Sequence, residues 1–225
     1  MKKLTSLFLA LLLTLSLCVP ALAADEPSDW AHAEVDGAIG HELVPADLQS
    51  NYQAPITRAE FCRLVVQLMR KTFAEDFVEF AEENGGFSHS FTDTNDREIL
   101  AAAELAIVNG VGGGKFNPNG SITRQEAATM LARAANVLML TPGLALSFQD
   151  AGQFAPWARD GIDFTSGLID PFNQWRVMGG TGNDMFSPFG SYTREQAICT
   201  MMRIYDNWLM KTMDPDGYNE MFGFG

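Results

Sequence analysis

A short motif that recurs three times combines residue types able to bind an anion. The motif is Thr-Arg-x-Glu or Thr-Arg-x-Gln, and its arginines are Arg58, Arg124 and Arg194. A planar guanidinium binds a carboxylate or phosphate through two parallel hydrogen bonds. Where the motif opens a helix, free backbone N–H groups lie beside the arginine and favour an anion. The sequence therefore predicts up to three anion sites of one design.

The same motif also has a structural explanation. A Thr followed three residues later by Glu or Gln, ahead of an apolar run, is typical of a capping box that satisfies backbone N–H groups at a helix start. Capping accounts for six residues, namely Thr57, Glu60, Thr123, Glu126, Thr193 and Gln196. It does not account for an arginine at the first helical position, which the helix dipole disfavours by roughly 0.3–1 kcal/mol. An ion pair with an acid of a neighbouring copy is the alternative to a ligand, and both stay open.

Glycine-rich turns precede the second and third motifs. Gly112 and Gly113 lie in one turn, and Gly180 and Gly182 lie in the other. These glycines either adopt positive φ in tight turns or let a ligand approach the backbone. The first turn does not fit the phosphate-loop pattern, and no predicted strand precedes it.

The chain is built from three copies of one unit. The motifs are offset by 66 and 70 residues, and residues 107–135 align without a gap on residues 177–205, with ten of 29 positions identical. Such self-similarity indicates one supersecondary unit used several times. Each unit is predicted to contain a first helix, opening near Trp30, Asp96 or Trp157, then a turn with a short extended segment, and then a second helix.

The second helices carry apolar stripes that none of them can bury alone. The spacing i, i+3, i+4, i+7 is that of one helix face packed on a core. The predicted stripes are Phe61, Leu64, Val65 and Leu68 in copy one, Ala127, Met130, Leu131 and Ala134 in copy two, and Ala197, Thr200, Met201 and Ile204 in copy three. The fold class is therefore mainly α, with the second helices packed together.

A helix opening with Trp-Ala, a Gly-x-Gly turn, Phe-x-Pro and Ile-Thr-Arg-x-Glu together resemble the S-layer homology (SLH) repeat. The resemblance covers nearly all of residues 27–207 and is weakest in copy one. It implies a pseudo-threefold, three-pronged helical bundle. It also implies non-covalent attachment to a bacterial cell wall through a secondary cell wall polymer, an acidic and often pyruvylated glycan. No cofactor or metal is implied.

Carried over by position, the resemblance makes Arg58, Arg124 and Arg194 ligand-binding residues in grooves between adjacent copies. Trp30 and Trp157 become candidate sugar-facing residues, with ordinary packing as the alternative, and Trp175 is a looser candidate. Copy one lacks the glycine turn, and copy two lacks a Trp at its first helix. We therefore expect one or two competent grooves rather than three equal ones.

The pattern divides the chain into copies and connecting segments. The predicted boundaries are an export signal at 1–23, copy one at 24–71, an acidic linker that extends the preceding helix at 72–90, copy two at 91–139, a linker at 140–147, copy three at 148–207 and a C-terminal tail at 208–225. Copy three contains an insertion, residues 170–176, between its first helix and its glycine turn. The sequence assigns no oligomeric state.

The N-terminus predicts export to the cell surface. Lys2 and Lys3 precede an apolar run of 13 residues and the small-x-small pattern Ala21-Leu22-Ala23, which is typical of a cleaved signal. The run is shorter than the ~20 residues of a membrane span. A retained anchor and a lipoprotein attached at Cys18 are the alternatives. Once the signal is removed, no membrane insertion is expected.

Charge and motif content exclude several functions. Removal of residues 1–23 leaves 13 basic and 28 acidic residues, a net charge of −15. General nucleic-acid binding needs a broad basic surface and is therefore excluded. The chain contains no HExxH or G-x-S-x-G motif, so we expect a binding module rather than an enzyme. The alternatives are a surface structural or protein-interaction subunit without glycan binding, and a polysaccharide-processing enzyme with an unrecognised site. Cys62 and Cys199 are expected to be buried free thiols.

Overall fold

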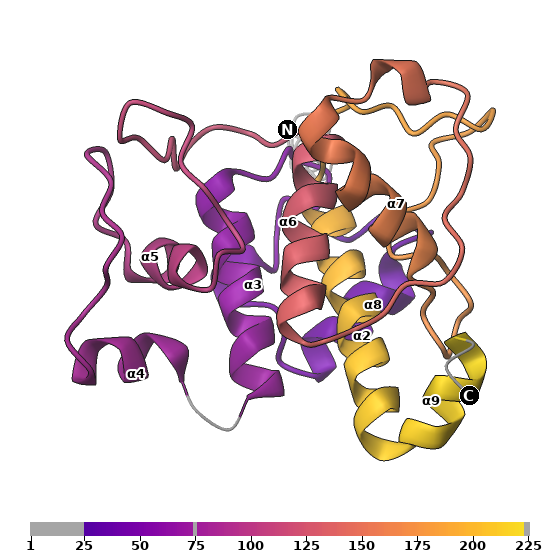
Figure 1. The fold of residues 1–225 in the computed structure, drawn as a ribbon, viewed down its shortest axis with the longest axis horizontal. Coiled ribbons are helices and arrows are strands. Elements are labelled where there is room, and N and C mark those ends of the chain that lie inside the picture. Colours follow the sequence, from indigo (N-terminus) through magenta and orange to yellow (C-terminus); the bar gives the residue numbers. More distant parts are fainter. Residues whose placement is uncertain (1–24, 74–75, 223–225) are drawn as a thin grey trace, which may run out of the picture.

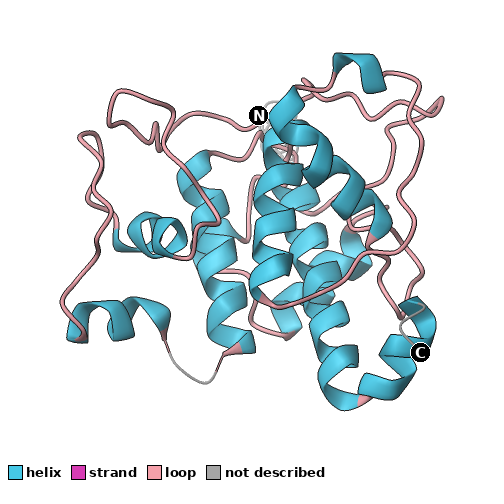
Figure 2. Cartoon of the chain, in the orientation of Figure 1, coloured by secondary structure: helices cyan, strands magenta, loops and turns pink. Residues whose placement is uncertain are grey.

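The computed structural model describes residues 25–73 and 76–222, so the predicted export signal at 1–23 lies outside the described residues. The described part is helical and contains no β-strand (Figure 2), which confirms the mainly α fold class. Its α-helices are α2 (His32–Gly40), α3 (Arg58–Thr72), α4 (Phe77–Glu83), α5 (Arg97–Glu104), α6 (Arg124–Val137), α7 (Arg159–Gly167), α8 (Arg194–Met213) and α9 (Pro215–Phe222). Three 3-10 turns join them, η1 (Ala46–Leu48), η2 (Ala151–Gln153) and η3 (Pro156–Ala158).

The second helices α3, α6 and α8 begin at the three motifs. Each starts with a capping box in which the N-cap Thr and the Glu or Gln three residues later satisfy one another's backbone N–H groups. The predicted apolar stripes are all buried. These helices lie side by side in the centre of the molecule (Figure 1).

The first helices pack across copies rather than within them. Helix α5 lies on α3, α7 lies on α6, and α2 lies on α8 (Figure 1). The α7–α6 contact is close enough that a Cβ on Gly161 would come within 2.7 Å of the Thr129 Cα. Each first helix therefore covers the second helix of the copy before it, and the first copy covers the last.

The segments that lead into the motifs form a closed ring of hydrogen bonds at the centre of the fold. Ile122 N donates to Ile56 O (3.3 Å), Ile56 N donates to Tyr192 O (2.9 Å), and Tyr192 N donates to Ile122 O (3.3 Å). All three residues are buried. Contacts between the copies are thus cyclic, while an overall threefold axis stays a prediction.

The linker after copy one differs from its prediction. Helix α3 ends at Thr72, and Phe73 is extended with ψ of 150°, so residues 72–90 do not continue that helix. Asp76 instead starts the separate helix α4 by accepting from Val78 N (2.9 Å), and its carboxylate pairs with Arg70 (2.7 Å). The prediction of a helix extension is therefore wrong, because an Asp cap restarts the helix.

The C-terminal residues belong to the fold. Helix α8 passes the predicted boundary at 207 and ends at Met213, and α9 folds back onto it with Tyr218 buried. Residues 208–222 are therefore not a free tail. None of the described helices is both long enough and apolar enough to cross a membrane.

The thiols of Cys62 and Cys199 are both buried and free, as expected from the sequence. Burial raises the pKa of both thiols. A thiol kept protonated in this way is a poor nucleophile.

Candidate ligand-binding grooves

Arg58 and Arg124 each reach into the following copy. Arg58 donates from Nε to Phe116 O (2.8 Å) and from Nη2 to Asn109 O (2.6 Å). Arg124 repeats this arrangement, donating from Nε to Phe186 O and from Nη2 to Gly179 O, both at 2.8 Å. These two arginines are held by backbone carbonyls, which neither alternative from the sequence had foreseen.

Each of these guanidinium groups keeps one nitrogen unused. The Cζ of Arg58 lies 4.4 Å from the centre of the Phe116 ring, and that of Arg124 lies 4.8 Å from the Phe186 ring, which supports both cations. Burial lowers the pKa of both side chains. Within the described residues, neither Nη1 atom has a hydrogen-bond partner. Both arginines are therefore fixed in place with a donor to spare.

Arg194 is bonded differently. Its Nη2 pairs with Glu60 Oε1 at 2.6 Å, and its Nη1 donates to the carbonyl of Ser50. Its Nε is buried with no partner in the described part of the chain. The ion-pair interpretation therefore holds for Arg194, which joins copy three to copy one.

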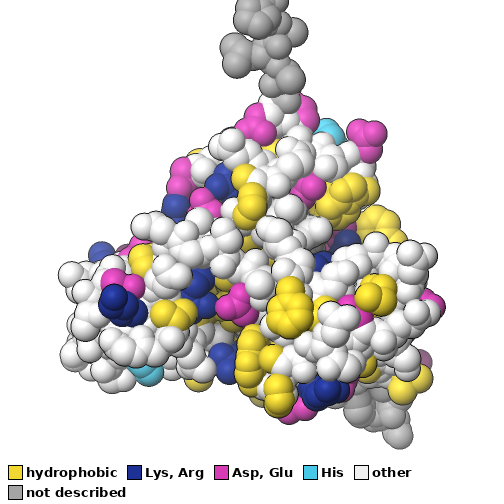
Figure 3. All heavy atoms as spheres, turned by 90° about the horizontal axis from the view of Figure 1, so that it is seen from above, with side chains coloured by type: hydrophobic (Ala, Val, Ile, Leu, Met, Phe, Trp, Pro, Cys, Tyr) yellow, Lys and Arg dark blue, Asp and Glu magenta, His cyan; other side chains and the backbone are white. Residues whose placement is uncertain are grey.

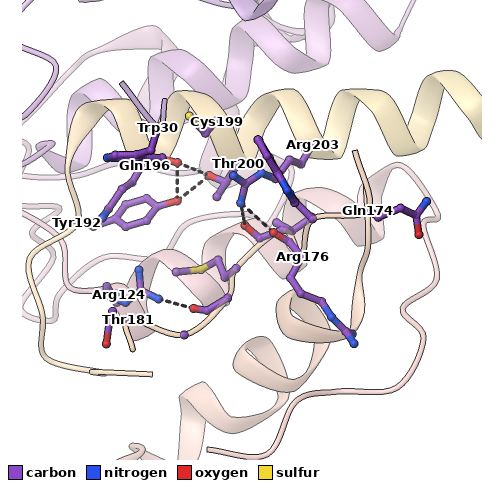
Figure 4. Close-up of a pocket in the computed structure, with 15 residues that line it drawn as sticks. Trp30, Arg124, Gln174, Arg176, Thr181, Tyr192, Gln196, Cys199, Thr200 and Arg203 are labelled. Carbon is purple, nitrogen blue, oxygen red and sulfur yellow. Dashed lines mark hydrogen bonds between the residues drawn. The ribbon is translucent and has the colours of Figure 1, made fainter. Parts of the chain in front are cut away.

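Arg124 lies in a groove of about 600 Å³, called here the Arg124 groove. Copy three supplies its turn and the face of α8, copy one supplies Trp30, and the 170–176 insertion supplies Trp175. Figure 4 shows Arg124 and Trp30 toward one end and Gln174 toward the other, with Arg203 between them. Three copies and the insertion thus contribute to one site.

Arg58 lies in a second groove of about 500 Å³, called here the Arg58 groove. It is built in the same way one copy earlier, with the turn and α6 of copy two and Trp157 of copy three. Seven lining positions recur 70 residues later in the Arg124 groove, namely Asn109, Gly110, Val111, Glu126, Thr129, Met130 and Arg133. The two grooves are therefore equivalent sites of one repeated architecture.

The predicted sugar-facing residues are placed where a ligand can meet them. Trp30 is 50% exposed and Trp157 is 57% exposed, and each lines the groove of the preceding copy. Exposed hydrophobic side chains stand beside Lys and Arg on the face seen from above (Figure 3). Trp175, the looser candidate, also lines the Arg124 groove.

The predicted glycines divide into two groups. Gly180 lines the Arg124 groove, where a Cβ would lie 3.0 Å from Met185 O. Gly112, Gly113 and Gly182 have positive φ and line neither groove. Glycine is favoured at these three positions because the turn backbone has positive φ there.

Arg203 is a groove residue that sequence reasoning missed. It forms two 2.6 Å hydrogen bonds with Glu34 of α2, and it donates to Arg176 O at 2.9 Å. Although burial opposes its charge, Glu34 raises the pKa of Arg203. The repeat alignment contained a signal, because Arg203 and Arg133 are identical residues 70 positions apart.

Carboxylates that hold the turns were also missed. Asp93 accepts from Phe116 N and Asn117 N, and Asp150 accepts from Phe186 N and Ser187 N, all at 2.8–2.9 Å. The same Phe-x-Asp sequence precedes the first helix in copies two and three, and this recurrence could have identified the two acids. These acids fix the carbonyls on which the groove arginines rest.

Comparison with known families agrees with this construction. Residues 90–128, from the start of copy two into α6, match the model of the S-layer homology domain. Within this range the chain is similar to the S-layer homology domain. The SLH family anchors proteins to the cell wall, which points to a cell-surface location.

Three relatives are similar to this chain over most of its length. An amylopullulanase of Thermoanaerobacterium thermosulfurigenes is 26% identical over 77% of the chain, and exoglucanase XynX of Acetivibrio thermocellus is 25% identical over 77%. An endoglucanase of Bacillus sp. (strain KSM-635) is 24% identical over 87%. The chain spans only 9%, 15% and 21% of the length of these three proteins, respectively.

Proposed function

We propose that the chain anchors itself non-covalently to a bacterial cell wall by binding an acidic secondary cell wall polymer in the Arg58 and Arg124 grooves. The observation that carries this proposal is the pairing, in both grooves, of a fixed arginine that keeps an unused Nη1 with an exposed Trp. The arginine suits a carboxylate, such as that of a pyruvate ketal, and the Trp suits the apolar face of a sugar ring.

The geometry favours a ligand over a merely structural role for the arginines. Their carbonyl contacts already hold them in place, so a bound carboxylate meets a preorganised donor and costs little further ordering. The groove volumes fall within the roughly 300–1,000 Å³ common for small-ligand sites.

The acidic character of the chain is compatible with an acidic ligand. A net charge of −13 for the whole chain opposes long-range attraction of anions. A single arginine in a recessed groove acts at contact distance, where the opposing surface charges are screened over about 8–10 Å. Binding is therefore expected to be specific rather than a general affinity for polyanions.

The proposal includes no catalytic role. The similarity to the three polysaccharide-degrading relatives covers at most about a fifth of their length, so their named activities do not transfer to this chain. Incubation of the purified protein with wall polysaccharide should release no reducing ends. Turnover above that of a buffer control would support the enzyme instead.

Retention on purified cell walls tests the function. Wild-type protein should sediment with walls and should fail to do so after hydrofluoric acid removes the secondary polymer. Trp30→Ala and Trp157→Ala should each weaken retention about tenfold, as expected for a Trp that makes a central contact, and the double variant should abolish it. Phe80→Ala is the matched control, because Phe80 is 49% exposed but lines neither groove.

Two outcomes would overturn the proposal. Equal retention on stripped and intact walls would show that the polymer is not the ligand and would favour the protein-interaction alternative. Equal retention by the double variant and the wild type would show that the grooves are not the binding sites.

A further inference from the structure

We propose that the insertion at residues 170–176 gives the Arg124 groove a second aromatic subsite, which holds one more sugar ring than the Arg58 groove can hold. This inference rests on the proposed function, since it concerns the length of glycan bound at one of the two grooves. The Arg58 groove is lined by Trp157 alone among the tryptophans, whereas Trp30 and Trp175 both line the Arg124 groove.

The insertion is a closed turn with a defined shape. Asp170 N donates to Trp175 O (2.7 Å), and Gln174 N donates back to Asp170 O (2.9 Å). The buried Asp170 carboxylate accepts from Phe172 N (2.8 Å) and from the Asn173 side chain (3.0 Å). The backbone beneath Trp175 is thus fixed before any ligand arrives.

Trp175 is also supported from the protein side. The Cζ of Arg203 lies 5.3 Å from the centre of the indole ring, and Arg203 is itself held by both oxygens of Glu34. A cation against one face of an indole is a favourable contact. Because Trp175 remains 45% exposed, it can offer the groove an apolar surface with little side-chain entropy left to lose.

The two tryptophans of this groove come from different parts of the fold. Trp30 precedes α2 and Trp175 is the next-to-last residue of the insertion, and the groove they share is about 600 Å³. In Figure 4 the insertion residue Gln174 lies at the end of the groove away from Arg124 and Trp30. A chain of at least two sugar rings, with its acidic substituent at Arg124, fits this arrangement.

The hydrogen-bonding groups along the groove match hydroxylated rings. Gln196 and Thr181 line it with an amide and a hydroxyl group, whereas the buried Thr200 hydroxyl is bonded to Tyr192 and to backbone carbonyls of α8. Thr181 and Thr200 are threonines where the Arg58 groove has Val111 and Met130. The Arg124 groove is therefore the larger of the two, at about 600 Å³ against about 500 Å³, and it has two threonines at positions where its counterpart is apolar.

Calorimetric titration with size-sorted fragments of the secondary polymer tests the inference. The fragments are released from purified walls by hydrofluoric acid and contain one, two or three sugar rings, each ring counting as one unit. Trp175→Ala should weaken binding of the two- and three-unit fragments about 2- to 12-fold, the range expected for one aromatic contact, and should leave the one-unit fragment unchanged. Phe172→Ala is the matched control, since Phe172 is in the same insertion, 57% exposed and outside the groove lining.

A second measurement observes Trp175 itself during binding to the wild-type protein. In wild-type protein labelled with 5-fluorotryptophan, the Trp175 resonance, assigned with Trp175→Phe, should shift with two- and three-unit fragments but not with the one-unit fragment. An unmoved Trp175 resonance, or equal losses by Trp175→Ala for all fragment lengths, would overturn the subsite. If wild-type protein binds none of the fragments, the proposed function itself fails.

Discussion

The junctions at Arg58 and Arg124 differ from the junction at Arg194, although all three arginines follow the same Thr and are equally buried. At the first two, the next copy offers a glycine turn and a Phe-x-Pro segment, whose carbonyls take Nε and Nη2 and leave Nη1 unused. At the third, copy one has no such turn, and Glu60 and Ser50 take both terminal nitrogens. The loop of the next copy, rather than the motif, decides whether the arginine keeps an unused Nη1.

A tryptophan is present at the Arg58 and Arg124 junctions and absent from the Arg194 junction. Each open groove receives a Trp from the segment just before the first helix of the following copy, whereas the first helix of copy two opens with Asp96 and Arg97. The closed junction therefore lacks both halves of the site.

The largest expected effect concerns the wall of the Arg124 groove. Arg203→Ala leaves the Glu34 carboxylate buried without its bidentate partner, which typically costs about 3–5 kcal/mol of unfolding free energy. The matched change Arg133→Ala in the Arg58 groove removes one long bond, 3.4 Å to Ile107 O, and should cost about 1 kcal/mol or less. Urea unfolding curves of the two variants measure the difference. Equal losses would mean that Arg203 does not hold copies one and three together.

The closed junction yields the next largest effect. Arg194→Ala should lower the unfolding free energy by about 1–3 kcal/mol, because it leaves the partly buried Glu60 unpaired. Wall retention per folded molecule should not change, because Arg194 lines neither groove. Glu60→Gln is the companion variant, since Gln196 shows that Gln can complete the capping box in this fold. Weaker wall retention by folded Arg194→Ala would show that the third junction also binds.

The local structure of each copy was predictable from the sequence, but the contacts between copies were not. Helix starts, capping boxes and apolar stripes depend on residues within four positions of each other, so periodicity and motif spacing identified them. The packing of α2 on α8 joins residues some 170 positions apart, and no local pattern specifies it. The choice of Glu60 as partner for Arg194 likewise depends on which copy lies next to copy three.

The candidate site was predicted only in part, because residue type is visible in the sequence but packing is not. Trp30, Trp157 and the two groove arginines stand out by residue type, and the structure places them in the grooves. Residue type leaves two explanations for the turn glycines, a tight turn or a ligand contact, and three of the four have positive φ and line neither groove. The orientation of a turn relative to a neighbouring helix, which separates these cases, is a property of packing.

An effect of similar size should depend on pH at Asp206, on the helix α8 that forms one face of the Arg124 groove. Burial raises the pKa of Asp206 to about 7, with further contributions from the negative charges of Asp170 and Glu34. Since the folded state binds this proton more tightly than the unfolded state, its contribution to stability is present at low pH and is lost as pH rises toward 7. Asp206→Asn, which introduces the residue found at the equivalent position 136, should therefore raise stability at pH 8 by about 1–3 kcal/mol.

The measurement for Asp206 is a pair of urea titrations at pH 5 and pH 8. The variant should gain much more over the wild type at pH 8 than at pH 5. A gain that is the same at both pH values would show that Asp206 does not titrate in this range.

The smallest expected effect compares the charge of the two grooves. Gln196 lines the Arg124 groove where Glu126 lines the Arg58 groove, and both side chains complete capping boxes. Gln196→Glu should keep the helix start intact and weaken binding of an acidic glycan at the Arg124 groove about 2- to 5-fold, because a carboxylate is then added near the site. The reciprocal Glu126→Gln should strengthen binding at the Arg58 groove by a similar factor. Calorimetry at 0.05 M and 0.5 M salt separates the charge effect from a change of shape, since only the former shrinks as salt rises. Factors that are independent of salt would mean that the acidic part of the glycan lies away from this position.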